Sequence, residues 1–170
     1  MNTTSVKLHS FDYGQTKTYG VSALFILGNI VFPQLCHLIP GGGATLLPIY
    51  FFTLLGAYKY GWRVGLLTAL LSPVVNAALF GMPAVTALPA IMFKSVTLAL
   101  AAGWAAAHFK RVSLVIMAGV VVLSQLLGTG FEWAVTGSLT AALQDVRIGM
   151  AGILLQIAGC WAIIKYVLTR

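Results

Sequence analysis

Residues 62–80 read WRVGLLTALLSPVVNAALF, and this run decides the class of the protein. After Arg63 it contains no charged residue up to Phe80. A helix of about 20 mainly apolar residues is long enough to cross the hydrocarbon core of a bilayer. The run therefore predicts a membrane-spanning helix.

The rest of the chain has the same character. Of its 170 residues, 59% are hydrophobic and only 8% are charged, whereas soluble domains have about 25% charged residues. No segment shows the strict alternation of a barrel strand, which leaves helices as the spanning elements. We therefore expect an all-α integral membrane protein.

Counting apolar runs predicts a six-transmembrane-helix bundle. Residues 1–18 are polar and lack the pattern of a cleaved signal peptide, so we expect a cytoplasmic tail there and one transmembrane domain over 19–170. The predicted spans are 19–36, 44–58, 62–80, 86–108, 112–135 and 147–168.

The basic residues predict the orientation of this bundle. With six spans, eight of the ten Lys and Arg residues lie on one side, and Arg147 lies on the other. The positive-inside rule then places both termini in the cytoplasm. We therefore expect a multi-pass protein of the cell's inner, or cytoplasmic, membrane. The net charge of +7 is explained by topology and gives no support to nucleic-acid binding. The eight residues are Lys7, Lys17, Lys59, Arg63, Lys110, Arg111, Lys165 and Arg170.

Polar residues within the spans gather in their outer halves, as do the prolines. Polar groups and irregular backbone at membrane depth are tolerated where they line a cavity or contact one another. We therefore predict a substrate pocket open to the outside. Its candidate residues are Lys94, Asn76, Glu132, Asn29, His37 and Gln125. Instead of contacting a ligand, Asn29 and Asn76 could equally form hydrogen bonds between helices. His37 could instead be solvated or hydrogen-bond to a loop.

Lys94 stands out because it interrupts the apolar segment PAIMFKSVTLAL, residues 89–100. A lysine at this depth reaches water only in part, so it requires an ion-pair partner or an anionic ligand. Glu132 is the candidate partner on the next span. On the same span, Ala99 and Gly103 have the spacing of small residues that permits close helix contact, within the bundle or with another membrane protein.

Catalytic and cofactor motifs are absent from the sequence. It contains no HExxH or GxSxG pattern and only three acidic residues, so we expect no enzymatic activity. Cys36 and Cys160 are far apart in the chain, which indicates neither a metal nor a redox site. The segment GGGATLL lacks the lysine of a nucleotide-binding loop, so ATP hydrolysis would have to come from partner proteins.

The segment from Leu46 to Gly103 resembles the substrate-binding S components of energy-coupling factor (ECF) vitamin transporters. The similar features are LLPIYFFTLLGAYKYG, the short turn into GLLTALLSPVVNAALFGMP, and a following helix that opens on a proline-containing run. The resemblance implies a six-helix protein that captures a vitamin from outside, with a T component and two ATPase subunits as partners. It also implies a pocket beneath the loop after the first helix, here His37–Ala44, with Gly41, Gly42 and Gly43 as a flexible lid.

One feature departs from the family. Many members have an AxxxA motif on the first helix for contact with the T component, and GVSALFILGNIVF does not contain it. The resemblance therefore leaves open which helix contacts the T component.

The leading hypothesis is an S component that binds a small water-soluble vitamin, and Lys94 favours an anionic one because a buried ammonium stabilises a carboxylate. Two other classes remain as alternatives. One is a small membrane-embedded enzyme or enzyme subunit acting on a lipid or isoprenoid, and the other is a structural subunit of a membrane complex.

Overall fold

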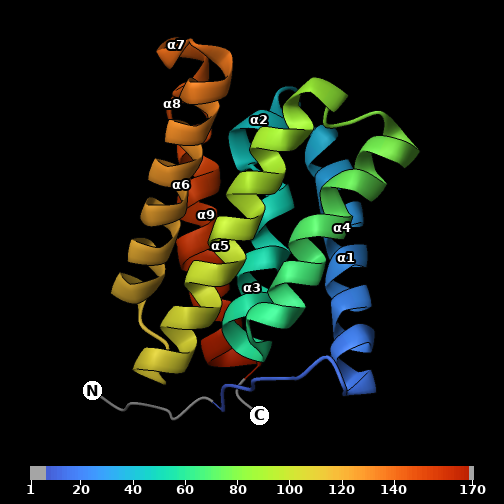
Figure 1. Ribbon diagram of the computed structural model, residues 1–170, viewed down its shortest axis with the longest axis vertical. Helices are drawn as coiled ribbons and strands as arrows, with labels where there is room; N and C mark the ends of the chain where they lie inside the picture. The colour runs from blue at the N-terminus through green and yellow to red at the C-terminus, as the bar shows by residue number, and fades with distance from the viewer. Residues whose placement is uncertain (1–6, 169–170) are drawn as a thin grey trace.

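The computed structural model describes residues 7–168, which form a bundle of α-helices with no β-strand in that range. Figure 1 shows the helices running roughly along the long axis of the bundle. The all-α prediction is confirmed. The helices are α1 (Thr16–His37), α2 (Gly42–Leu46), α3 (Phe51–Tyr60), α4 (Trp62–Phe80), α5 (Leu88–Phe109), α6 (Leu114–Thr136), α7 (Leu139–Ala142), α8 (Gln144–Ile148) and α9 (Met150–Ala162).

Five helical segments in the described part of the chain are long and apolar enough to cross a membrane, which makes this a multi-pass membrane protein. They are Thr16–His37, Trp62–Phe80, Val85–Phe109, Leu114–Thr136 and Met150–Val167. The last of these continues α9 through a π-helical turn, Ile163–Val167. Each corresponds to a predicted span, although the span predicted from residue 147 begins at Met150, after α8.

The segment predicted as one span over 44–58 is interrupted. The five-residue helix α2 ends at Leu46. The next residue, Leu47, has a left-handed φ of 46°, and a 3₁₀ turn over Pro48–Tyr50 leads into α3. Proline fits the first turn of a new helix because its missing N–H would have no partner there. With 10 residues, α3 is about 15 Å long, roughly half the thickness of the hydrocarbon core. Six continuous spanning helices are therefore not confirmed.

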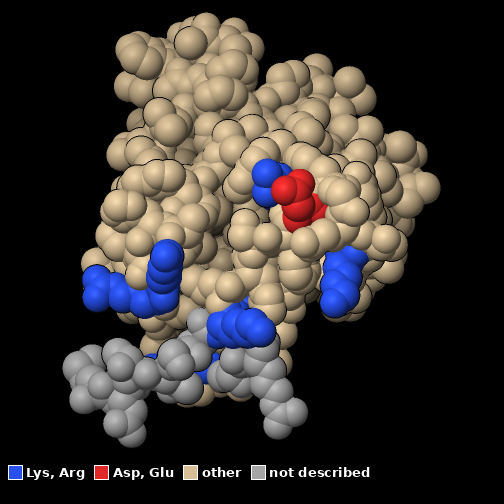
Figure 2. Space-filling model, turned by 60° about the horizontal axis from the view of Figure 1, so that its bottom comes forward, with Lys and Arg blue, Asp and Glu red and all other residues tan. Residues whose placement is uncertain are grey.

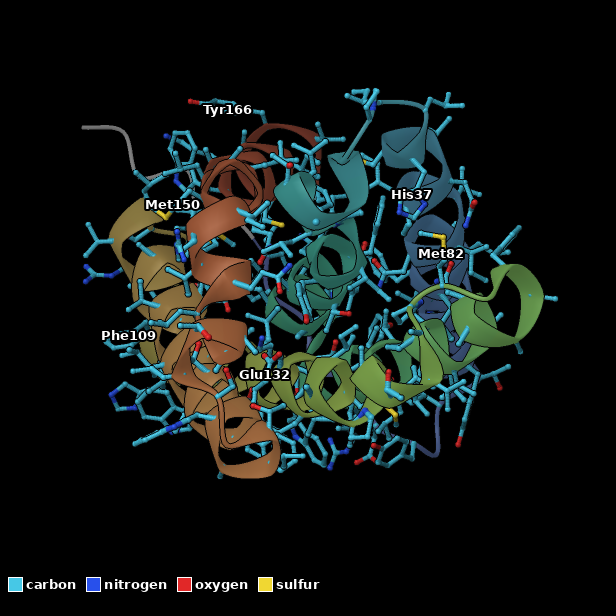
Figure 3. The ribbon with its side chains drawn as sticks, turned by 90° about the horizontal axis from the view of Figure 1, so that it is seen from above. His37, Met82, Phe109, Glu132, Met150 and Tyr166 are labelled. Carbon is cyan, nitrogen blue, oxygen red and sulfur yellow. The ribbon has the colours of Figure 1, made fainter. Side chains whose placement is uncertain are left out.

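The short helix α3 lies in the middle of the bundle. It packs against α1, α4, α5 and α9, and seen from above it lies between α1 and α9 (Figure 3). Leu54, Ala57 and Tyr58 are completely buried. On α4, Gly65 permits the close approach to α3, because a Cβ at that position would lie 2.3 Å from Ala57 Cβ.

Asn29 connects α3 to the two helices beside it. From α1, its Nδ2 donates to Thr53 Oγ1 at 3.1 Å and to Ser72 Oγ at 3.2 Å, and its Oδ1 accepts from the Phe52 backbone N–H at 3.2 Å. That N–H lies in the first turn of α3, where backbone donors have no partner within their own helix. Asn29 therefore stabilises the start of a helix that begins inside the bundle.

Lys59 connects the two ends of the described chain at the lower end of the bundle. Lys59, at the end of α3, is completely buried, and its Nζ donates to the carbonyls of Lys7, at 2.7 Å, and Leu168. Both ends of the described chain therefore meet at the turn between α3 and α4. Figure 2 shows Lys and Arg side chains gathered along this end, while the upper part of the visible face is uncharged. The sequence predicts this segregation of basic residues to one end. That this end faces the cytoplasm stays a prediction.

Charge on His9 is expected to loosen the N-terminal segment at this end. His9 N donates to Lys59 O at 2.8 Å, and the imidazole stacks on Tyr60 with 5.8 Å between ring centroids. Burial lowers the pKa of His9, and the nearby Lys59, Lys7 and Lys17 lower it further. Because the folded pKa is below the usual value of about 6.5, protonation favours the detached segment.

We therefore expect attachment of the segment to be complete above about pH 6.5 and to weaken as the pH falls from there to the folded pKa. Hydrogen exchange at the His9 amide, measured between pH 7 and 5, checks this after correction for intrinsic rates. In His9→Gln the corrected protection should not change with pH. An equal pH dependence in that variant would contradict the assignment to His9.

Candidate functional site

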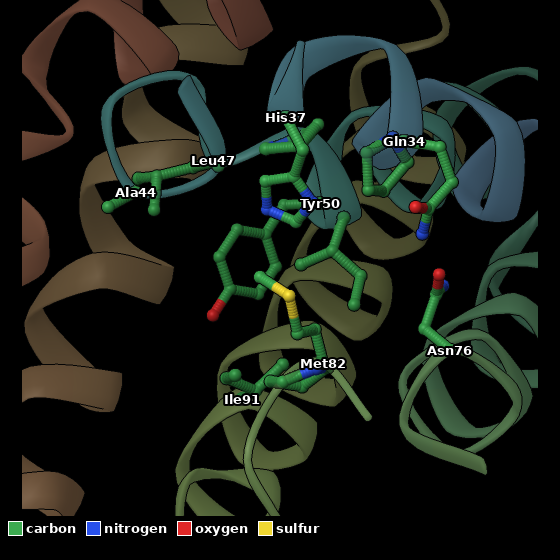
Figure 4. Close-up of a pocket in the computed structure, with 13 residues that line it drawn as sticks. Gln34, His37, Ala44, Leu47, Tyr50, Asn76, Met82 and Ile91 are labelled. Carbon is green, nitrogen blue, oxygen red and sulfur yellow. The ribbon is translucent and has the colours of Figure 1, made fainter. Parts of the chain in front are cut away.

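A cavity of about 240 Å³ lies beneath α2, at the end of the bundle away from Lys59 (Figure 4). The end of α1, the segment from α2 to the start of α3, the last turns of α4 and the first turns of α5 contribute its walls. Most of the walls are apolar. The lining residues are Pro33, Gln34, His37, Gly43, Ala44, Leu47, Pro48, Ile49, Tyr50, Asn76, Met82, Pro83 and Ile91.

The exposure of the lining residues shows which part of the cavity is open. His37, Ala44 and Met82 are exposed to solvent, whereas Tyr50 and Asn76 are buried. The cavity therefore has its mouth at the first three residues and its floor at the other two. The mouth lies at the end opposite the basic turns, where the distribution of polar residues placed the predicted pocket, and substrate binding there stays a prediction.

Asn76 presents a hydrogen-bond acceptor at the floor. Its Nδ2 donates to the backbone carbonyls of Asn29 at 2.9 Å and Ser72 at 3.0 Å. Two acceptors on one side fix the orientation of the amide, since the reversed amide would place Oδ1 against both carbonyls. The Oδ1 atom is buried without a hydrogen-bond partner. A buried acceptor in this state costs about 1–3 kcal/mol, which a donor group in the cavity would offset.

Two further polar side chains line the cavity on α1. Gln34 and His37 are three residues apart and so lie on one helix face. The amide of Gln34 points toward that of Asn76 (Figure 4). The cavity thus combines apolar walls with a few polar groups that converge from different helices, as small-molecule sites do.

The predicted lid is an ordered part of the structure. Gly41 has a φ of 73° and precedes α2, which Gly42 and Gly43 begin. A Cβ on Gly42 would lie 2.1 Å from the backbone carbonyl oxygen of Cys36, so a glycine is required for α2 to lie this close to the end of α1. Of the three glycines, Gly43 lines the cavity.

Lys94 and Glu132 form an ion pair beside this cavity. Lys94 Nζ lies 2.6 Å from Glu132 Oε2, and the two side chains are 4% and 22% exposed. Neither residue lines the cavity beneath α2. Lys94 instead borders a small closed space with Gln125, Ser124 and Tyr50. Tyr50 is a lining residue of both spaces.

The predicted site residues therefore fall into three groups. His37, Asn76 and Gly43 line the cavity. Lys94, Glu132 and Gln125 lie on α5 and α6 outside its lining. Asn29 is also outside the lining and hydrogen-bonds to Thr53, Ser72 and Phe52. The prediction left out Gln34, Tyr50 and Met82. The spacing of Gln34 from His37 was a usable signal, whereas Tyr50 and Met82 have the pattern of ordinary apolar core residues.

Comparison with protein-family models, with curated proteins and with solved structures finds no match to this chain. The resemblance to ECF S components thus remains an expectation based on the residues from Leu46 to Gly103.

Proposed function

We propose that this protein captures a small water-soluble molecule, a vitamin or related micronutrient, for import across the membrane. In this proposal it acts as the substrate-binding subunit of an ECF-type importer, and a T component and two ATPases supply the energy. The observation that supports it most is Asn76 Oδ1, a buried acceptor without a partner at the floor of an open cavity. An acceptor fixed in this way selects a ligand that donates an N–H or O–H group.

The geometry changes the expected chemistry of the ligand. Lys94 favoured an anionic vitamin, but its ammonium lies 2.6 Å from the Glu132 carboxylate, and neither residue lines the cavity. The cavity itself offers two amides, an imidazole and apolar walls. We therefore propose a ligand recognised mainly by hydrogen bonds and apolar contact, with no requirement for a negative charge.

Native mass spectrometry of the protein purified from cells grown in rich medium tests this proposal. We expect a retained small molecule that dissociates on mild activation. Asn76→Leu should weaken its binding by roughly tenfold, the value of one hydrogen bond to a buried acceptor. Ile91→Trp, which fills the cavity from α5, should abolish it, whereas Leu79→Trp on the exposed side of α4 should not.

Two results would contradict the proposal. One is a retained molecule whose binding is equal in the wild type, Asn76→Leu and Ile91→Trp. The other is the absence of any retained molecule together with unchanged melting temperatures in the presence of nicotinamide, nicotinate, pantothenate, biotin, thiamine and riboflavin. If nicotinate bound and nicotinamide did not, and Lys94→Met abolished binding, the anionic-ligand hypothesis would replace ours.

A further inference from the structure

A second hollow lies on the outside of the bundle, between α5 and α6, and it is apolar throughout. It has a volume of about 510 Å³. Trp104 forms much of one wall and is 63% exposed, and Gly119 lies opposite, where a Cβ would meet nothing within 4 Å. We call this hollow the α5–α6 groove. Its lining residues are Leu100, Ala101, Trp104, Ala105, Phe109, Ile116, Gly119, Val120 and Leu123.

The groove follows α5. Its lining runs from Leu100 to Phe109, about 14 Å along that helix. Apolar side chains over this length offer contact to an extended hydrocarbon chain.

Two basic residues follow the end of the α5 wall in the chain. Lys110 and Arg111 are exposed in the loop that joins α5 to α6, next to Phe109. The Tyr58 hydroxyl donates to the Arg111 carbonyl at 2.7 Å, which fixes the position of this loop. In the described part of the chain, Glu132 is paired with Lys94 and Asp12 with Arg63, so neither carboxylate neutralises the loop.

Aromatic rings mark the same level of the bundle. Trp104 stacks on His108 with 5.1 Å between centroids and an interplanar angle of 6°, and it meets Phe109 edge-on. Tryptophan gathers at the boundary between hydrocarbon and headgroups, where its ring is apolar and its N–H can donate. The apolar α5 wall therefore ends in aromatic rings, and the loop that follows it has two exposed cations.

We propose that the α5–α6 groove binds a membrane phospholipid with an anionic headgroup. One acyl chain lies along Trp104 and Gly119, and the headgroup phosphate contacts Lys110 and Arg111. Each basic residue near a membrane surface attracts anionic lipid, and the groove adds apolar contact for the chain. The site is separate from the cavity beneath α2 and does not depend on the proposed import function.

Lipid titration with native mass spectrometry of delipidated protein tests the site. Dioleoyl phosphatidylglycerol should bind roughly tenfold to thirtyfold more tightly than dioleoyl phosphatidylcholine, which has the same chains. The double substitution Lys110→Gln, Arg111→Gln should remove this preference, whereas Lys17→Gln, which removes an exposed cation on α1, should leave it. Gly119→Leu should weaken the binding of both lipids by about tenfold or more. A side chain at this position meets nothing within 4 Å and so would occupy the groove.

Gly130→Leu is the matched control, since a Cβ at Gly130 on α6 also meets nothing within 4 Å and Gly130 lies outside the groove. Equal affinity for the two lipids, or equal effects of Gly119→Leu and Gly130→Leu, would overturn the proposal. So would displacement of phosphatidylglycerol by millimolar inorganic phosphate, which would indicate a site for a free anion. A polypeptide that remains bound to the wild type and is released by Gly119→Leu would assign the groove to a protein partner instead.

Discussion

Glu132→Gln should destabilise the folded protein by about 3–5 kcal/mol, because it leaves the Lys94 ammonium buried without its carboxylate. The Lys94 side chain is only 4% exposed, and its aliphatic part packs on Gly128, where a Cβ would lie 2.2 Å from Lys94 Cγ. The ammonium cannot therefore move freely toward water. Reversible unfolding in mixed detergent and dodecyl sulfate micelles measures the difference.

Lys94→Met, which removes the other partner of the ion pair, should lower the free energy of unfolding by less. Lys94→Met retains an unbranched chain of similar length against Gly128, and it leaves a carboxylate that is 22% exposed and can take up a proton. We expect the double variant Lys94→Met, Glu132→Gln to recover most of the stability lost in Glu132→Gln. Lys17→Met, an exposed lysine on α1, serves as the control for loss of charge alone. Additive effects of the two substitutions would show that the ion pair does not contribute to stability.

Hydropathy located the helices well and missed the interruption in one of them. The run 62–80 was predicted with the bounds of α4, because charged and aromatic turn residues flank an apolar segment of spanning length. Residues 44–58 are equally apolar, but the left-handed Leu47 and the 3₁₀ turn after it divide them. The free energy of transfer to lipid depends on composition, so it does not distinguish one continuous helix from two short ones.

The sequence predicted the depth of the candidate site but not which side chains face one another. Counting along each span placed His37, Asn76 and Lys94 in the outer half, and the cavity lies at that end of the bundle. Whether Lys94 faces Glu132 or the cavity depends on how α5 is rotated about its axis. That rotation is set by packing against α3, α4 and α6, which requires the three-dimensional structure.

Gly103→Ala should destabilise the protein by about 3 kcal/mol, although alanine is normally the better helix former. The Cβ would lie 2.4 Å from Trp62 Cβ and 2.7 Å from both Trp62 Cα and N. These atoms belong to the first turn of α4, so the clash moves backbone and cannot be relieved by a side-chain rotation. The row of small residues that includes Ala99 and Gly103 is buried within the bundle, which assigns it to internal packing rather than to a partner protein.

Gly119→Ala and Gly130→Ala are the matched controls, because a Cβ at either position on α6 meets nothing within 4 Å. They should leave the free energy of unfolding unchanged or raise it by up to about 1 kcal/mol. The same micelle unfolding assay compares all three variants with the wild type. A Gly103→Ala variant as stable as these controls would mean that α4 and α5 do not approach as closely as Trp62 and Gly103 indicate. Asn76 lies on α4, so a shift of α4 in Gly103→Ala should also weaken the binding of any molecule retained in the cavity beneath α2.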